Sequence, residues 1–150
     1  MGAESGITVR PTAQGPAGGA LSGTYPNPAI QNAAGSVSSV SLPANTLSTI
    51  QTTAVLAVGT WVLSWNCNIL GSAAGTIAIT VANGTGTGTL TGQSVGTVTL
   101  ANGTNVEVSL DFVITVTVAG TFTISGQTSA TGAGTTLAGA ATGYTATKVA

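Results

Sequence analysis

The chain has 150 residues, a length that suits one domain with a single hydrophobic core. It carries only two basic and three acidic side chains, or 3% charged residues, where an ordinary soluble domain has roughly a quarter. Because there is no basic patch and no histidine, we expect neither nucleic acid nor a membrane surface as a partner, and the commonest general base and metal ligand are missing.

Residues 1–36 are predicted to form an extended arm. The segment is rich in glycine, shows no sustained apolar periodicity and holds four of the five prolines, Pro11, Pro16, Pro26 and Pro28. Its first residues lack the basic and apolar regions of a secretion signal, and Gly6 stands where myristoylation needs Ser or Thr. We therefore expect neither a secretion signal nor a lipid anchor.

Residues 37–150 are predicted to form one all-β domain, because short alternating runs rich in Val, Ile and Thr are separated by Gly and Asn-Gly. Strands are expected at 37–42, 47–58, 61–69, 76–82, 87–91, 95–100, 105–118, 120–126 and 143–149, and a loop from Gly132 to Ala141. About eight to ten strands at this spacing are typical of a β-sandwich or jelly roll.

The predicted strand 61–69 has both tryptophans on one face. Trp61 and Trp65 share their parity with Leu63, Cys67 and Ile69, and polar residues alternate with them. The alternation favours a core position for the tryptophans and for Cys67, which would act as a small apolar side chain. The alternative for Trp61 and Trp65 is an exposed platform on which sugars stack.

The run 105–118 carries the clearest strand pattern. Every even position is apolar: Val106, Val108, Leu110, Phe112, Ile114, Val116 and Val118. Because the run is longer than a common strand, we expect a bend or bulge near Asp111.

Glu107 and Asp111 leave the same face of this strand, about 13–14 Å apart. A glycosidase pair needs about 5–9.5 Å, so the two carboxylates are interpreted as solvated surface charges. The alternative is a cation held where three copies of Asp111 or Glu107 converge in a symmetric oligomer. No catalytic residue, metal ligand or cofactor is assigned, and an enzyme is not expected.

Two Asn-Gly pairs, Asn83-Gly84 and Asn102-Gly103, are predicted to form hairpin turns, because both central residues of a type I′ turn have positive φ. The glycines at 84, 86 and 88 are interpreted as a hairpin loop, since neither a lysine nor a helix follows them as a phosphate-binding loop requires.

A surface so poor in charge offers little repulsion against association. Glycine and threonine allow close backbone approach and neutral hydrogen bonds without burial of a charge. The composition therefore predicts that much of the surface is covered by further copies of the chain or by a large assembly.

The run from Gly15 to Ile30, GPAGGALSGTYPNPAI, resembles a segment of bacteriophage virion proteins, particularly fibres and head or tail appendages, that is usually written GGDLSGTYPNP. Ala20 stands where that segment has aspartate. The resemblance implies an arm that anchors the chain to a virion. Its prolines fix an extended backbone and its apolar side chains serve as anchors. The anchoring residues would be Leu21, Tyr25, Pro26, Pro28 and Ile30.

The rest of the chain resembles the small trimeric jelly rolls, similar in fold to tumour necrosis factor, that decorate phage heads or cap fibres. The resemblance lies in Gly59–Asn66 and Gly143–Ala150. It implies a homotrimer whose threefold axis runs along packed sheets. Core and trimer packing would come from Trp61, Trp65, Phe112 and Tyr144.

Together these features predict a phage structural protein on the capsid exterior. It would be a capsid decoration protein, of the cement or head-fibre kind, whose partners are its own copies and the major capsid protein or another virion protein. The alternative is a tail-fibre or head-fibre tip that binds host surface glycans, which solvent-facing tryptophans or a polar groove would favour.

Overall fold

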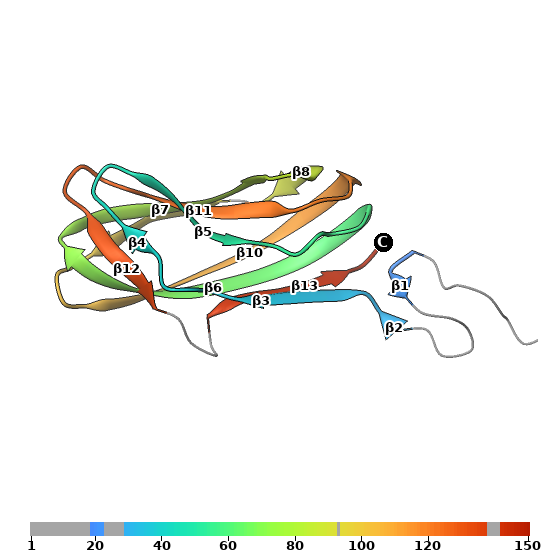
Figure 1. Cartoon of the computed structure of the whole chain (residues 1–150), viewed down its shortest axis with the longest axis horizontal. Coiled ribbons are helices and arrows are strands. Elements are labelled where there is room, and N and C mark those ends of the chain that lie inside the picture. The colour runs from blue at the N-terminus through green and yellow to red at the C-terminus, as the bar shows by residue number, and fades with distance from the viewer. Residues whose placement is uncertain (1–18, 23–28, 93, 138–141) are drawn as a thin grey trace, which may run out of the picture.

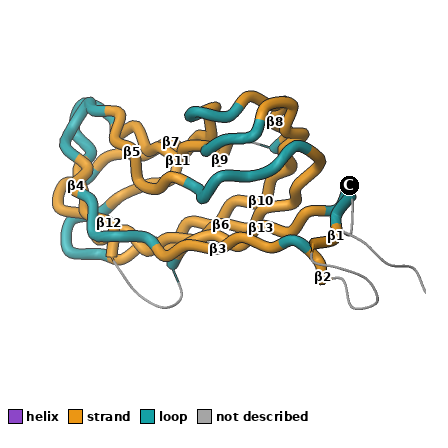
Figure 2. Tube along the Cα trace, turned by 45° about the vertical axis from the view of Figure 1, so that its right-hand side comes forward, coloured by secondary structure: helices purple, strands orange, loops and turns teal. Residues whose placement is uncertain are grey.

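The computed structural model of the protein describes residues 19–22, 29–92, 94–137 and 142–150. Over these residues the chain is all-β, and two antiparallel sheets face one another as a β-sandwich (Figures 1 and 2). None of these ranges contains a helix long and apolar enough to cross a membrane. The predicted all-β class and the sandwich are therefore confirmed.

The larger sheet has seven strands in the order β3-β13-β6-β10-β8, and β12 and β4 continue it beside the second half of β6. These strands are β3 (Asn32–Ser36), β4 (Ser41–Leu42), β6 (Gly59–Ala73), β8 (Thr87–Thr91), β10 (Asn105–Val118), β12 (Ala133–Leu137) and β13 (Gly143–Lys148). We call it the seven-stranded sheet.

The smaller, four-stranded sheet has the order β5-β11-β7-β9. Its strands are β5 (Leu47–Thr52), β7 (Gly75–Asn83), β9 (Ser94–Leu100) and β11 (Phe122–Thr128). A separate pair, β1 (Leu21–Ser22) and β2 (Ala29–Ile30), lies beside the C-terminus, with Leu21 opposite Ile30 (Figure 1).

One core lies between the sheets and follows the alternation of the two longest strands. Odd positions of β6 and even positions of β10 point inward. Trp61 and Trp65 are 3% and 1% exposed, and Phe112 and Tyr144 are buried with them. The tryptophans therefore form no exposed platform.

The seven-stranded sheet begins earlier than the sequence indicates. β3 lies within the predicted arm, where Ala33 and Ala34 pair with Ala146 and Thr145 of β13. Of the predicted strand 37–42, only Ser41–Leu42 is a strand. Ladder bonds join backbone groups, so a small-residue run without apolar alternation can pair as well as a patterned one.

The Asn-Gly pairs do not form hairpins. Strands β7 and β8 belong to different sheets, as do β9 and β10, so each pair connects one sheet to the other. At the second pair the Thr104 amide donates to the Ala101 carbonyl at 3.2 Å, and Gly103 has a φ of 72°. Asn102 has no positive φ, which a type I′ turn would require.

The predicted loop 132–141 is wrong over Ala133–Leu137, which form β12 between β4 and β6. The strand lacks a strong apolar pattern, but Thr136 is fully buried in it. The Thr136 hydroxyl donates to the Ser38 carbonyl at 2.8 Å and accepts from the Val40 amide at 2.7 Å. A hydroxyl here satisfies backbone groups of the segment before β4, which explains a buried polar residue in a strand.

Replacing Thr136 with valine is expected to lower the free energy of unfolding by about 1–3 kcal/mol, because the Val40 amide and Ser38 carbonyl lose their partner while the volume is unchanged. Thr136→Ser keeps the hydroxyl and should cost clearly less. Urea unfolding of both variants measures the difference. Equal losses would show that the methyl group, and not the hydroxyl, matters.

The predicted bulge near Asp111 is absent from the pairing of β10 with β6. The register of β10 against β6 is unbroken from Asn105 to Val116, and the irregularity lies against β8, between Val116 and Val118. The shift takes Val118 out of the core, so that it is 55% exposed although its parity predicts burial. The predicted strand 47–58 also ends early, at Thr52.

Candidate functional site

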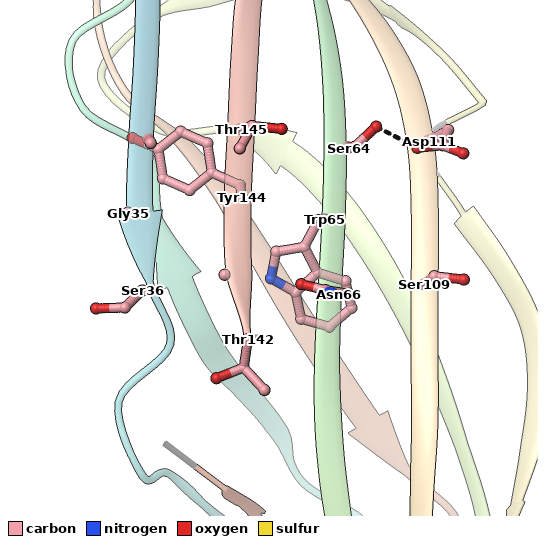
Figure 3. A pocket seen from close by; sticks show the side chains of 12 residues that line it. Gly35, Ser36, Ser64, Trp65, Asn66, Ser109, Asp111, Thr142, Tyr144 and Thr145 are labelled. Atoms are coloured by element: carbon pink, nitrogen blue, oxygen red, sulfur yellow. Dashed lines mark hydrogen bonds between the residues drawn. The ribbon is translucent and has the colours of Figure 1, made fainter. Parts of the chain in front are cut away.

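A groove of about 670 Å³ lies on the outer face of the seven-stranded sheet, over β3, β13, β6 and β10 (Figure 3). Two rows of opposed residues form its floor. One row is Ala34, Thr145, Ser64 and Asp111, and the other is Ser36, Gly143, Asn66 and Ser109. Because these side chains are short, they leave a hollow in the middle of the sheet face that longer side chains would fill.

Gly143 is needed at the centre of the groove. Its φ is 149°, and a Cβ there would lie 2.1 Å from the Gly35 carbonyl oxygen. Close approach of β3 and β13 therefore excludes a side chain at this position. The absence of that side chain adds to the hollow between Ser36 and Asn66.

The polar groups of the groove are hydroxyls, one amide and one carboxylate. The Ser64 hydroxyl donates to Asp111 Oδ1 at 2.5 Å, as the dashed line in Figure 3 marks. Asp111 is the only carboxylate among the lining residues. Such a surface can exchange hydrogen bonds with an uncharged polar ligand, such as a sugar or another protein's hydroxyl and amide groups.

Glu107 does not join Asp111 in the groove. It lies opposite Asn68, whereas Asp111 lies opposite Ser64. Within the described ranges, no three His, Cys, Asp or Glu side chains are grouped closely enough to hold a metal ion. A cation held by three copies of Asp111 or Glu107 remains a prediction about an assembly.

Beneath the groove, one buried and one partly buried hydrogen bond join the seven-stranded sheet to β5 and the segment that follows it. Trp65 Nε1 donates to Gln51 Oε1 at 3.0 Å, and the Tyr144 hydroxyl accepts from the Ala54 amide at 2.6 Å. Gly35 is required here as well, since a Cβ on it would lie 2.7 Å from Tyr144 Cε1. The groove floor thus rests on aromatic side chains that are fixed by polar contacts.

Sequence reasoning missed Gln51 as the partner of Trp65. Both Ile50 and Gln51 are buried, and the register of β5 against β11 shifts beside them, so parity could not identify Gln51 as inward-facing. The one available signal was a single amide side chain in a run that otherwise consists of apolar and small polar residues.

Cys67 lies on the inner face of β6, 1% exposed, with its thiol 3.4 Å from the Asn68 carbonyl oxygen. Burial raises the pKa of the Cys67 thiol from 9.0 to about 11. A thiol with so little thiolate at neutral pH is a poor nucleophile. Its surroundings fit the predicted small apolar role.

Cys67 is expected to resist thiol reagents at pH 8 in the folded protein and to react at once on unfolding, which a chromogenic disulfide measures. Since its pKa is higher in the folded state, its contribution to stability is complete below pH 9 and is lost as the pH rises toward about 11. Cys67→Ala should flatten that part of the stability curve. Rapid labelling of folded protein at pH 8 would contradict the burial.

Of the anchoring residues, the structure describes Leu21 and the backbone of Ile30, which pair in β1 and β2. Tyr25, Pro26 and Pro28 lie outside the described residues. The base of this pair is bonded to the body, because the Lys148 amide donates to the Gln31 carbonyl at 2.9 Å and Gln31 Nε2 donates to the Leu21 carbonyl at 2.9 Å.

The chain was compared with known proteins at three levels. No protein-family model, no curated protein and no solved structure matches it significantly. The class that the fold defines is therefore the β-sandwich, and any narrower assignment rests on the residues themselves.

Proposed function

We propose that this chain is a structural protein of a bacteriophage virion, a capsid decoration protein that its N-terminal arm attaches to the capsid. Its body is a jelly roll that associates as a homotrimer on the capsid exterior. The protein acts mechanically: it adds contact area across neighbouring capsid subunits, and three arms on one trimer bind with avidity.

The observation that carries the proposal is the near absence of charge on the surface. Among the described residues, the charged side chains are Glu107, Asp111 and Lys148, and Lys148 is only 8% exposed. Both exposed charges lie on one face of the seven-stranded sheet. A protein that works alone in solvent normally carries more charge over more of its surface, whereas an assembly component is covered.

The strand order supports a jelly roll. From β5 to β11, successive strands alternate between the two sheets, and β3 pairs with the last strand, β13. The paths β3-β13-β6-β10 and β5-β11-β7-β9 are typical of that fold, in which antiparallel strands cross between two sheets instead of forming consecutive hairpins.

The arm supplies the attachment in this proposal. The run Gly15 to Ile30 resembles the virion-protein segment. Gln31 joins its base to β13, because the Gln31 side chain donates to the Leu21 carbonyl and the Gln31 carbonyl accepts from the Lys148 amide. An extended segment with apolar anchors binds well when it lies along another protein.

The test is binding to purified capsids of the encoding phage that lack the protein, with the full chain compared with a variant without residues 1–30. The deletion stops before β3, because removal of Asn32–Ser36 would take a strand from the seven-stranded sheet. A loss of capsid binding could then come from unfolding of the body instead of from loss of the arm. We expect capsid binding to be lost while the unfolding transition and the trimeric mass are kept. Unchanged capsid binding by the deletion variant would refute the role of the arm. A monomeric mass of the full chain would refute the trimer.

The second candidate function is a fibre-tip adhesin that binds host glycans, and the groove over Ser64, Asn66, Ser109 and Asp111 is the observation that favours it. Buried Trp61 and Trp65 count against it, since neither is available to stack on a sugar. Glycan-array binding by the full chain that Asp111→Asn abolishes would support this candidate; no binding on the array would count against it.

A further inference from the structure

Four valines are exposed at one end of the sandwich. Val55, Val58, Val118 and Val149 are 68%, 55%, 55% and 53% exposed. They make up most of the exposed large apolar side chains in the described residues, the others being Leu47, Val62 and Leu70. We call these four side chains the valine end.

Backbone pairing brings the four valines together from three parts of the chain. Gly59, next to Val58, lies opposite Val116, two residues before Val118. The Val149 amide donates to the Thr60 carbonyl at 2.8 Å. The starts of β6 and the ends of β10 and β13 meet at this end in Figure 1.

The segment that holds Val55 and Val58 is fixed with these side chains outward. Leu56 is fully buried and exchanges two backbone bonds with Gly120, at 2.9 and 3.1 Å. Trp61 Nε1 donates to the Ala57 carbonyl at 2.8 Å. The inward position is already filled by Leu56, so the valines do not belong to the core of a lone chain.

Several exposed neighbours of the valines are also apolar, and the charged side chain described beside them, Lys148, is only 8% exposed. Ala54, Ala57, Ala119 and Ala150 are all exposed at the same end. Elsewhere the outward positions are mostly Thr, Ser or Asn, for example at 64, 66 and 68 along β6. Exposed apolar side chains gathered at one end of an otherwise hydroxyl-rich surface are typical of an interaction site.

The arm joins the body at this end. The Lys148 amide donates to the Gln31 carbonyl one residue before Val149, and β1 and β2 lie beside the C-terminus in Figure 1. Residues 1–18, outside the described part, precede Gly19 in this pair. The arm therefore joins the body on the side of the molecule that presents the valine end.

We propose that the valine end docks onto an uncharged, apolar surface of the virion protein that receives the arm. This inference rests on the proposed function. A single sandwich end is smaller than the roughly 800 Å² per partner of a stable interface, so the end and the arm bind together, each raising the effective concentration of the other. A lipid surface is disfavoured, because the basic and aromatic side chains described near the valines, Lys148 and Trp61, are only 8% and 3% exposed and so are not free to meet lipid headgroups.

The test measures binding of full-length Val55→Asp/Val58→Asp to the capsids described above. The matched control is Leu47→Asp, since Leu47 is 60% exposed at the other end of the sandwich. Leu47 lies opposite Gln127, near the end of β11. The start of β11 lies at the valine end, where the Thr53 amide donates to the Phe122 carbonyl. We expect at least about a tenfold loss of affinity for the double variant and less than about a twofold change for the control. Val55→Ser/Val58→Ser serves if the aspartates impair folding, as circular dichroism would show.

Each outcome decides between the proposals. If residues 1–30 are needed for binding but the aspartate variant binds like wild type, the valine end is wrong and the arm stands. If the aspartate variant loses binding and the arm deletion does not, the valine end binds the capsid and the proposed role of the arm is wrong. A changed oligomeric mass of the aspartate variant would make the valine end a contact between copies. If wild type binds phosphatidylcholine vesicles and the aspartate variant does not, the valine end is a lipid contact. A changed oligomeric mass or this vesicle binding would each overturn the proposal.

Discussion

Replacing Trp65 with alanine is expected to lower the free energy of unfolding by about 3–5 kcal/mol, which is a large part of the about 5–15 kcal/mol that stabilises an ordinary domain. Trp65 is 1% exposed at the centre of β6, with β10 on one side and β13 on the other. Its loss leaves a cavity, and it also leaves Gln51 Oε1 buried without its donor. Denaturant unfolding, followed by circular dichroism because a tryptophan is removed, measures the loss.

Two further variants separate the volume of Trp65 from its hydrogen bond. Trp65→Phe keeps most of the apolar contact and should cost about 1–3 kcal/mol, mainly through the unpaired Gln51 oxygen. Gln51→Leu should cost a similar amount through the unpaired indole N–H. The double variant removes both partners and should be more stable than the sum of the single losses predicts. Strict additivity would show that the bond in the structure contributes nothing to stability.

The buried and exposed faces of the long strands could be predicted from the sequence, whereas the strands that pair with them could not. Alternation along 61–69 and 105–118 identified the buried side of β6 and β10, because side-chain direction in a strand has a period of two. Alternation contains no information on pairing, so Asn83-Gly84 was assigned a hairpin although β7 and β8 lie in different sheets.

Residues whose role depends on a hydroxyl or an amide were the ones that pattern reasoning missed. Thr136 forms a strand by satisfying backbone groups of Ser38 and Val40, about a hundred residues earlier in the chain. Gln51 is buried because Trp65 needs an acceptor. Neither requirement is visible until the tertiary partner is known.

The groove and the valine end could not be predicted for a related reason. The groove row of Ala34, Thr145, Ser64 and Asp111 comes from four strands that are distant in the sequence. Val118 fits the inward parity of β10, and only the register shift after Val116 turns it to solvent. Both surfaces depend on strand order and register, which composition and periodicity leave open.

Replacing Gly120 with alanine is expected to lower the free energy of unfolding by about 3 kcal/mol, because two backbones touch at this residue. A Cβ on Gly120 would lie 2.2 Å from the Gly86 nitrogen and 2.4 Å from its Cα. These atoms are held in place: the amides of Gly84 and Gly86 donate to the Thr121 carbonyl at 3.0 and 3.1 Å. Thermal or urea unfolding measures the loss.

Gly103→Ala is the matched control for that glycine. Gly103 has a φ of 72° and nothing within 4 Å of a Cβ, so alanine there meets strain without a clash and should cost only about 1–2 kcal/mol. Gly120 also exchanges its backbone bonds with Leu56, so displacing it moves the segment that carries Val55 and Val58. Gly120→Ala should therefore weaken capsid binding more than Gly103→Ala does. Equal stability losses, or equal capsid affinities, would mean that the contact between Gly86 and Gly120 does not position the valine end.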